Sequence, residues 1–165
     1  MALTLESAGK VRQKCKTYSL PPYAFAAIKA FFSYWASNKG NADLQFIPFT
    51  DYTTSATLAP HSIVQATGYS PIGGVTSTVH VFYAYNTGSA GTDSFISLIN
   101  STTNTNVDLA FITGMISTDL DNFLFVYPDG MVFGTDLTIS AATTNGGQTE
   151  SGVNAAGDGF VIVSA

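Results

Sequence analysis

The sequence has little charge, a single cysteine and only two histidines. Charged residues make up 10% of its 165 residues, against about 25% in a typical globular protein. One cysteine, Cys15, excludes an internal disulfide and a cysteine-rich zinc site. His61 and His80 are the only candidates for the usual general base, and their spacing matches no zinc motif. We therefore predict no catalytic residue, no metal or other cofactor, and no small-molecule substrate, so we do not expect an enzyme.

Motifs for nucleophilic and nucleotide chemistry are also missing. No Gly-x-Ser-x-Gly elbow and no Gly-Lys-Ser/Thr occurs. The densest acidic cluster contains Asp119 and Asp121. It lacks the glycine and the terminal glutamate of an EF-hand loop. A solvated turn is the expected structure there, and cation binding stays an alternative.

Long apolar runs are absent too. No run approaches the roughly 20 apolar residues that a bilayer-spanning helix needs. The basic residues near the N-terminus are not followed by the apolar run and cleavage site of a secretory signal. We expect no membrane partner and synthesis without export.

Basic residues are absent from most of the chain. All six lie in the first 39 positions with one acid, giving +5, whereas residues 40–165 carry ten acids and no base, giving −10. An acidic region repels phosphate, so we expect no nucleic-acid contact outside the N-terminal arm. Lys10, Arg12, Lys14 and Lys16 lie together in that arm. They predict either a docking patch for an acidic surface or a solvated helix face.

Two helices are predicted within residues 1–40. The first covers residues 4–17, with Thr4 as N-cap and Glu6 in the first turn, where the helix dipole favours an anion. The second covers residues 22–38, because Pro22 suits the first helical position and Gly40 suits the C-terminal cap.

The second predicted helix is apolar nearly all round. Phe25, Ile28, Phe32 and Trp35 share one face at helical spacing, and further apolar residues cover much of the rest. Such a helix is normally buried on more than one side. We expect it to pack on its own sheet and on a neighbouring subunit.

Beyond Gly40 the pattern becomes alternating, which predicts strands. The clearest candidate is residues 75–85, with His80 on its polar face. The nine predicted strands cover residues 44–49, 62–67, 75–85, 94–100, 107–113, 122–127, 131–133, 136–142 and 159–164.

The fold class that follows is mainly β, an antiparallel β-sandwich or jelly roll over residues 41–165 with an N-terminal helical segment, in one structural domain. The segment from Tyr127 to Gly130 places proline and then Asp-Gly between hydrophobic runs, which predicts a hairpin between residues 122–127 and 131–133.

In composition, order of elements and lack of a secretory signal, the chain resembles small virion structural proteins of tailed bacteriophages, such as capsid decoration (cement) proteins or tail components. The resemblance implies a virion protein in many copies, which forms homo-oligomers or binds other virion proteins. The cationic arm and the apolar helix would dock on the acidic β region of a neighbour. The alternative is a receptor- or glycan-binding module of a tail fibre or adhesin, with Tyr52 and Tyr69 as the loop aromatics.

Overall fold

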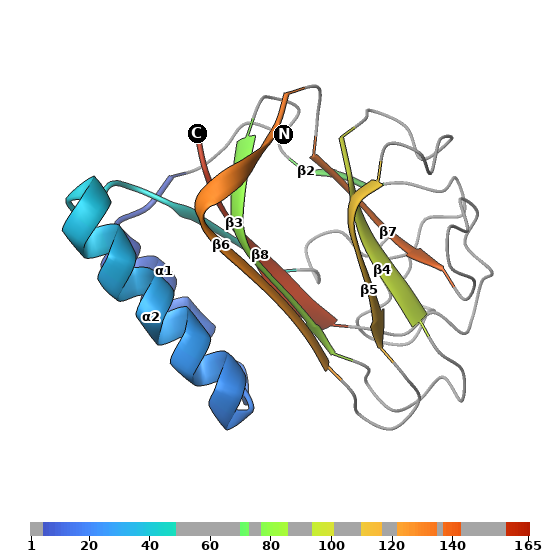
Figure 1. The fold of residues 1–165 in the computed structure, drawn as a ribbon, viewed down its shortest axis with the longest axis horizontal. Coiled ribbons are helices and arrows are strands. Elements are labelled where there is room, and N and C mark those ends of the chain that lie inside the picture. The colour runs from blue at the N-terminus through green and yellow to red at the C-terminus, as the bar shows by residue number, and fades with distance from the viewer. Residues whose placement is uncertain are drawn as a thin grey trace.

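A computed structural model of the chain describes residues 5–48, 70–72, 77–85, 94–100, 110–116, 122–134, 137–142 and 158–165. Over these residues the protein is mainly β, with two helices and two four-stranded antiparallel sheets (Figure 1).

The first sheet lies between the helices and the second sheet. Its strands, in spatial order, are β1 (Gln45–Pro48), β8 (Asp158–Ser164), β3 (Ser77–Tyr85) and β6 (Asn122–Phe133). Strand β8 reads Phe160, Val161, Ile162, Val163 without alternation, and all four side chains are buried. A strand that is apolar on both faces must be buried on both faces. The helices bury one of these faces of β8.

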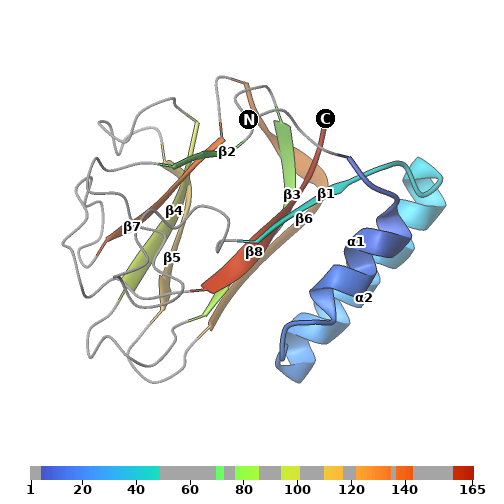
Figure 2. The same cartoon turned by 180° about the vertical axis from the view of Figure 1, so that it is seen from behind.

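The second sheet lies on the side of the first sheet away from the helices (Figures 1 and 2). Its strands, in spatial order, are β2 (Ser70–Ile72), β7 (Leu137–Ala142), β4 (Ser94–Ile99) and β5 (Ala110–Ile116). Strand β5 lies against β6 and β3 of the first sheet.

Helix α1 (Ala8–Cys15) is shorter than predicted. Its N-cap is Ser7, whose hydroxyl accepts a hydrogen bond from the Lys10 backbone N–H at 3.5 Å. Glu6 is not in the first turn, because it forms an antiparallel bridge with Leu44 through hydrogen bonds of 2.6 and 2.8 Å. The bridge holds the chain extended up to Ser7. Thr4, the predicted cap, lies outside the described residues.

Helix α2 (Pro22–Lys39) confirms the predicted helix and its ends. Pro22 occupies the first helical position, and Gly40 caps the other end in the left-handed conformation, at φ 59°. Glycine adopts that conformation without the steric cost that a Cβ brings.

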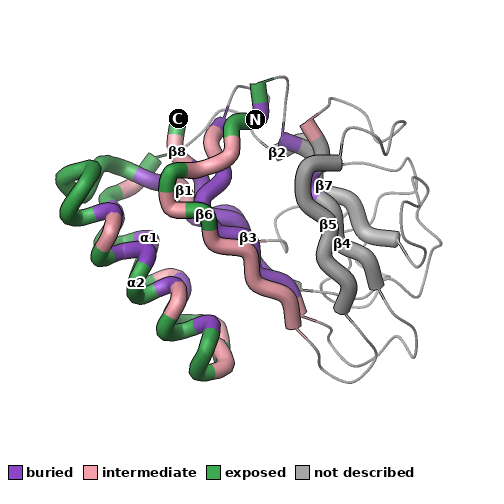
Figure 3. Tube along the Cα trace, viewed as in Figure 1, coloured by how far each residue is buried: buried purple, intermediate pink, exposed green. Residues whose placement is uncertain are grey.

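The helices share one core with the first sheet, so the helical segment, residues 8–39, lies against the β region (Figure 3). The helical side of this core contains Ala8, Val11, Cys15, Ala24, Ile28, Phe31, Phe32 and Trp35. The sheet side contributes Phe46, Val81, Tyr83, Phe160 and Ile162. Helix α2 is buried on this face alone within the chain, because Tyr23 and Phe25 remain 52% and 48% exposed.

The hairpin predicted around Pro128 is wrong. Residues 122–133 form the single strand β6, and both of its halves pair with β3. Val79 lies opposite Met131 and Val81 lies opposite Val126, so residues 127–130 all fall opposite His80. The turn-forming residues therefore make a bulge in one strand instead of a reversal of direction.

Strand β3 is bulged at the same place. Against β8, Val79 pairs with Val163 and Val81 pairs with Ile162, which leaves His80 as an extra residue. The bulge turns His80 toward helix α2, where it is 2% exposed and its ring lies 4.8 Å from that of Trp35. The prediction that His80 lies on the polar face of its strand is wrong, because strict alternation does not hold through a bulge.

The other predicted strands have mixed outcomes. Residues 44–49, 75–85, 94–100, 136–142 and 159–164 correspond to β1, β3, β4, β7 and β8 with small changes of boundary. The strand predicted at 107–113 lies later, as β5. Strand β2 was not predicted, because Pro71 lowers strand propensity; it is an edge strand, where proline is tolerated. Residues 62–67 lie outside the described residues.

Candidate functional site

The two helices run side by side on the outer face of the first sheet (Figure 2). A narrow groove is lined by residues of both helices and of the connection between them. Its apolar part is formed by Cys15, Leu20, Phe25, Ile28 and Phe32. Its other lining residues are the cations Arg12, Lys16 and Lys29. We call this surface, defined by those eight residues, the cationic groove.

The groove has almost no free volume. The enclosed space is about 20 Å³, little more than the room for one water molecule, for which about 10–15 Å³ is needed. A small molecule needs a pocket of about 300–1,000 Å³. The cationic groove is therefore too small to enclose a small molecule.

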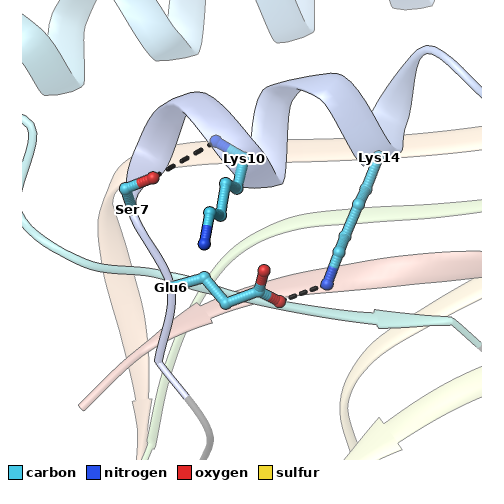
Figure 4. A network of polar contacts seen from close by, with 4 residues as sticks. All are labelled: Glu6, Ser7, Lys10 and Lys14. Atoms are coloured by element: carbon cyan, nitrogen blue, oxygen red, sulfur yellow. Dashed lines mark hydrogen bonds and ion pairs between the residues drawn. The ribbon is translucent and has the colours of Figure 1, made fainter.

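The cations of the groove are exposed. Arg12, Lys16 and Lys29 lie on the outer surfaces of the helical layer. Among the described residues, the one ion pair joins Lys14 to Glu6 (Figure 4). The pair is only partly buried, so solvent still screens it and it contributes about 0–1 kcal/mol. Its consequence is local: it holds Lys14 against the segment before α1 and away from the groove.

The residues predicted for interaction fall into two groups. Arg12, Lys16, Phe25, Ile28 and Phe32 come together at the cationic groove. Lys10, Lys14 and Trp35 do not line it.

Ile28, Phe32 and Trp35 are 3–6% exposed and pack inside the chain's own core. So little surface cannot form the main contact with a neighbour, so these three residues shape the helical layer instead. Phe25 differs, because it is the exposed aromatic side chain of the groove.

Lys29, Leu20 and Cys15 were missed by reasoning from the sequence. A signal for Lys29 was present, since it lies one turn after Phe25 and one turn before Phe32 on the same helix. Leu20 gave no such signal, because it belongs to the connection between the helices.

Cys15 is a structural residue at the base of the groove. Its thiol is buried, and burial raises its pKa to about 12. The thiolate is the nucleophilic and metal-binding form of cysteine. With that form disfavoured near neutral pH, Cys15 acts as a small apolar side chain.

A second polar cluster surrounds His80. Its Nδ1 lies 3.0 Å from the Pro128 carbonyl oxygen and its Nε2 lies 2.8 Å from Ser164 Oγ. In the neutral form, Nδ1–H donates to the carbonyl and Nε2 accepts from the serine hydroxyl. Burial is the main cause that lowers the His80 pKa, and the nearby Lys39 also lowers it.

A serine hydrogen-bonded to a histidine is also the nucleophile–base pair of some catalytic sites. Here the ring is packed against Trp35 and stacked on Phe31 at 5.7 Å, beneath helix α2. The arrangement ties α2, β3, β6 and β8 together, and we assign it a structural role. Trp35 Nε1 adds a further link by donating to the Ala42 carbonyl at 2.7 Å.

Other predicted sites are not visible in the described residues. The acidic cluster of Asp119 and Asp121, the loop aromatics Tyr52 and Tyr69, and His61 all lie outside them. In the part that the structure describes, no group of three or more His, Cys, Asp or Glu side chains is arranged to hold a metal ion. Neither described helix combines the length and hydropathy needed to cross a bilayer.

Comparison with protein-family models, with curated proteins and with solved structures finds no match for this chain.

Proposed function

We propose that this protein is a structural subunit of a virion, which binds a shell or tube as a decoration, cement or tail component and contacts other copies of itself. The observation that carries the proposal is the cationic groove. Three exposed cations and an exposed phenylalanine lie together on a helical layer whose own β region is acidic and carries no basic residue.

Charge complementarity supports a second copy as the partner. The acidic β region of one subunit is opposite in sign to the helical layer of another, and surfaces of opposite sign attract and orient each other. Phe25 adds apolar area at the centre of the contact, where aromatic residues contribute most to binding. A head-to-tail contact of this type repeats from subunit to subunit and so builds rings or larger assemblies.

We also propose that the two sheets form a jelly-roll sandwich. The support is the pairing of strands: β1 pairs with β8, β2 with β7, β3 with β6, and β4 with β5. This is the pattern of a long hairpin folded into two sheets, with the strand orders 1-8-3-6 and 2-7-4-5. Jelly rolls of eight strands occur in viral capsid and lectin domains, which agrees with a virion role.

Light scattering of the purified full chain at low and high salt tests the proposal. We expect an oligomer or particle that dissociates as salt rises, because salt screens exposed charges beyond about 10 Å at 0.1 M. The double variant Arg12→Glu with Lys16→Glu should fail to assemble at low salt.

The matched control is Lys10→Glu with Lys39→Glu, which changes net charge equally but reverses cations that do not line the groove. It should assemble at low salt. A monomer at every salt concentration, or equal assembly of both double variants, would contradict the proposed contact.

A further inference from the structure

A second hollow lies on the other side of the helix connection, between that connection and the first sheet. It is lined by residues of that connection, by the end of β3 and by the start of β6. It has a volume of about 620 Å³, within the range of about 300–1,000 Å³ for small-molecule sites. Its lining includes Thr17, Tyr18, Ser19, Tyr83, Tyr85 and Asn122. We call it the tyrosine hollow.

The aromatic walls of the tyrosine hollow are fixed by the core. The Tyr18 ring lies 5.0 Å from Phe160 and 5.9 Å from Phe46, and its hydroxyl donates to the Gly159 carbonyl at 3.1 Å. Tyr83 is buried, with its ring 5.5 Å from Phe160 and 6.0 Å from Tyr85. Walls held in this way lose little freedom when a ligand binds, which favours binding.

The polar groups of the hollow come from neighbouring elements. Asn122 is paired with Tyr85 in the ladder between β6 and β3, so its position is set by the sheet. Ser19 is exposed on the helix connection. Hydroxyl and amide groups both donate and accept hydrogen bonds, and here they surround aromatic rings.

None of the described lining residues of the tyrosine hollow is charged, and all six basic residues of the chain lie among the described residues, outside this lining. A phosphate, nucleotide or acidic sugar would enter without a cation to pair with it, and burying an unpaired charge is costly. A ligand with hydroxyl groups on its edges and C–H groups on its faces suits both the polar groups and the rings. We propose that the tyrosine hollow binds a neutral saccharide ring.

The affinity of one such site is weak, because one ring and a few exchanged hydrogen bonds leave a small net free energy. Many copies on one particle would raise the apparent affinity by about 10²–10⁴ through multivalency. The saccharide site itself does not depend on the proposed virion role, since it lies within one chain.

Saturation-transfer NMR tests the site on the full chain, at a salt concentration where it is monomeric. The probes are neutral monosaccharides, namely glucose, galactose, mannose and their N-acetylamino forms, with sialic acid as the anionic comparison. We expect transfer to at least one neutral sugar and none to sialic acid. Tyr85→Ala should weaken the binding about tenfold, the effect of losing roughly 1.4 kcal/mol of aromatic contact.

Two further variants separate loss of binding from loss of fold. Ser19→Arg places a bulky side chain over the hollow from an exposed position, so it should abolish binding while the circular dichroism spectrum stays unchanged. Tyr23→Ala removes an exposed tyrosine outside the hollow and should bind like wild type. The proposal is overturned by no transfer to any neutral sugar, by stronger transfer to sialic acid, or by unchanged transfer in Ser19→Arg. A failure of this kind leaves the light-scattering result unaffected, so the two proposals fail separately.

Discussion

The connection between the helices, residues 16–21, separates two surfaces that differ in almost every physical respect. Lys16 and Leu20 line the cationic groove, whereas Tyr18 and Ser19 line the tyrosine hollow. The groove has exposed cations and room for about one water, whereas the described lining of the hollow is uncharged and leaves room for a small molecule. Neighbouring residues of one short segment therefore line two surfaces of different chemistry.

What the two surfaces share is their dependence on the fit between the helices and the first sheet. The groove needs the two helices in place, and the hollow needs the connection held near the ends of β3 and β6. Changes that displace the helical layer from the first sheet should therefore have the largest effect, because they alter both surfaces at once.

The largest expected effect is that of Gly130→Val. Gly130 lies in the bulge at φ 85°, and a Cβ there would lie 2.6 Å from His80 Cε1 and closer still to Thr78 Cγ2. Backbone strain and this clash together should lower the free energy of unfolding by about 3 kcal/mol or more. Urea denaturation measures it, and both surfaces should be lost together.

Gly134→Val is the matched control, because a Cβ at Gly134 meets no atom within 4 Å. It should change stability by less than about 1 kcal/mol. Equal destabilisation by the two variants would show that the bulge does not fix the position of the helices on the first sheet.

The next largest effect is that assembly and sugar binding should be lost separately in different variants. Arg12→Glu with Lys16→Glu should remove assembly and leave transfer to a neutral sugar unchanged, because neither side chain lines the hollow. Tyr85→Ala should do the reverse. Light scattering and saturation-transfer NMR on the same preparations measure both, and a variant that loses both properties would indicate a single shared surface.

A smaller effect is expected from pH, through His80. Its pKa is lowered in the folded chain, so between that value and the unfolded value near 6.5 only the unfolded chain binds the proton. Stability from the neutral ring is therefore complete above about pH 6.5 and falls as pH drops below it. Asp129 opposes this shift and Lys39 adds to it.

Urea denaturation of wild type and His80→Gln between pH 5 and 8 measures this contribution. The glutamine variant should be less stable at pH 8 and should show a smaller fall toward pH 5. Parallel pH profiles would contradict the assignment to His80, since His61 is present in both proteins.

The smallest effect is expected from Tyr34→Phe. The Tyr34 hydroxyl donates to the carboxylate of Asp129, which raises the Tyr34 pKa, but the bond is exposed to solvent. Water replaces such a bond readily, so the midpoint of urea denaturation should not change measurably. A clearly lower midpoint would mean that this contact between α2 and the bulge helps to hold the helix on the sheet.

Reasoning from the sequence predicted elements whose signals are local. Helix α2 was predicted because Pro22 and Gly40 mark its ends, and β3 because its apolar residues alternate with polar ones. The bulge was mistaken for a hairpin because Pro-Asp-Gly fits both. Only the partner strand β3, which pairs on both sides of the bulge, distinguishes them.

The candidate sites were predicted only in part for the same reason. Arg12 and Lys16 stood out as an isolated cluster of cations, and the apolar face of α2 stood out by its period. Which apolar residues stay exposed was not predictable, because it depends on where the sheet meets the helix. The tyrosine hollow brings Tyr18 beside Tyr85 and Asn122, residues far apart in the chain, and no local pattern joins them.

The bulge of β6 also limits how these subunits can join. Strand β6 is at the edge of the first sheet, and a long open edge invites another chain to add a strand. Pro128 has no N–H to offer, and the bulge of residues 127–130 breaks the row of backbone groups. The bulge thereby protects this edge against pairing with another chain and growth into fibrils. In the proposed assembly, the number of copies would then depend on side-chain surfaces.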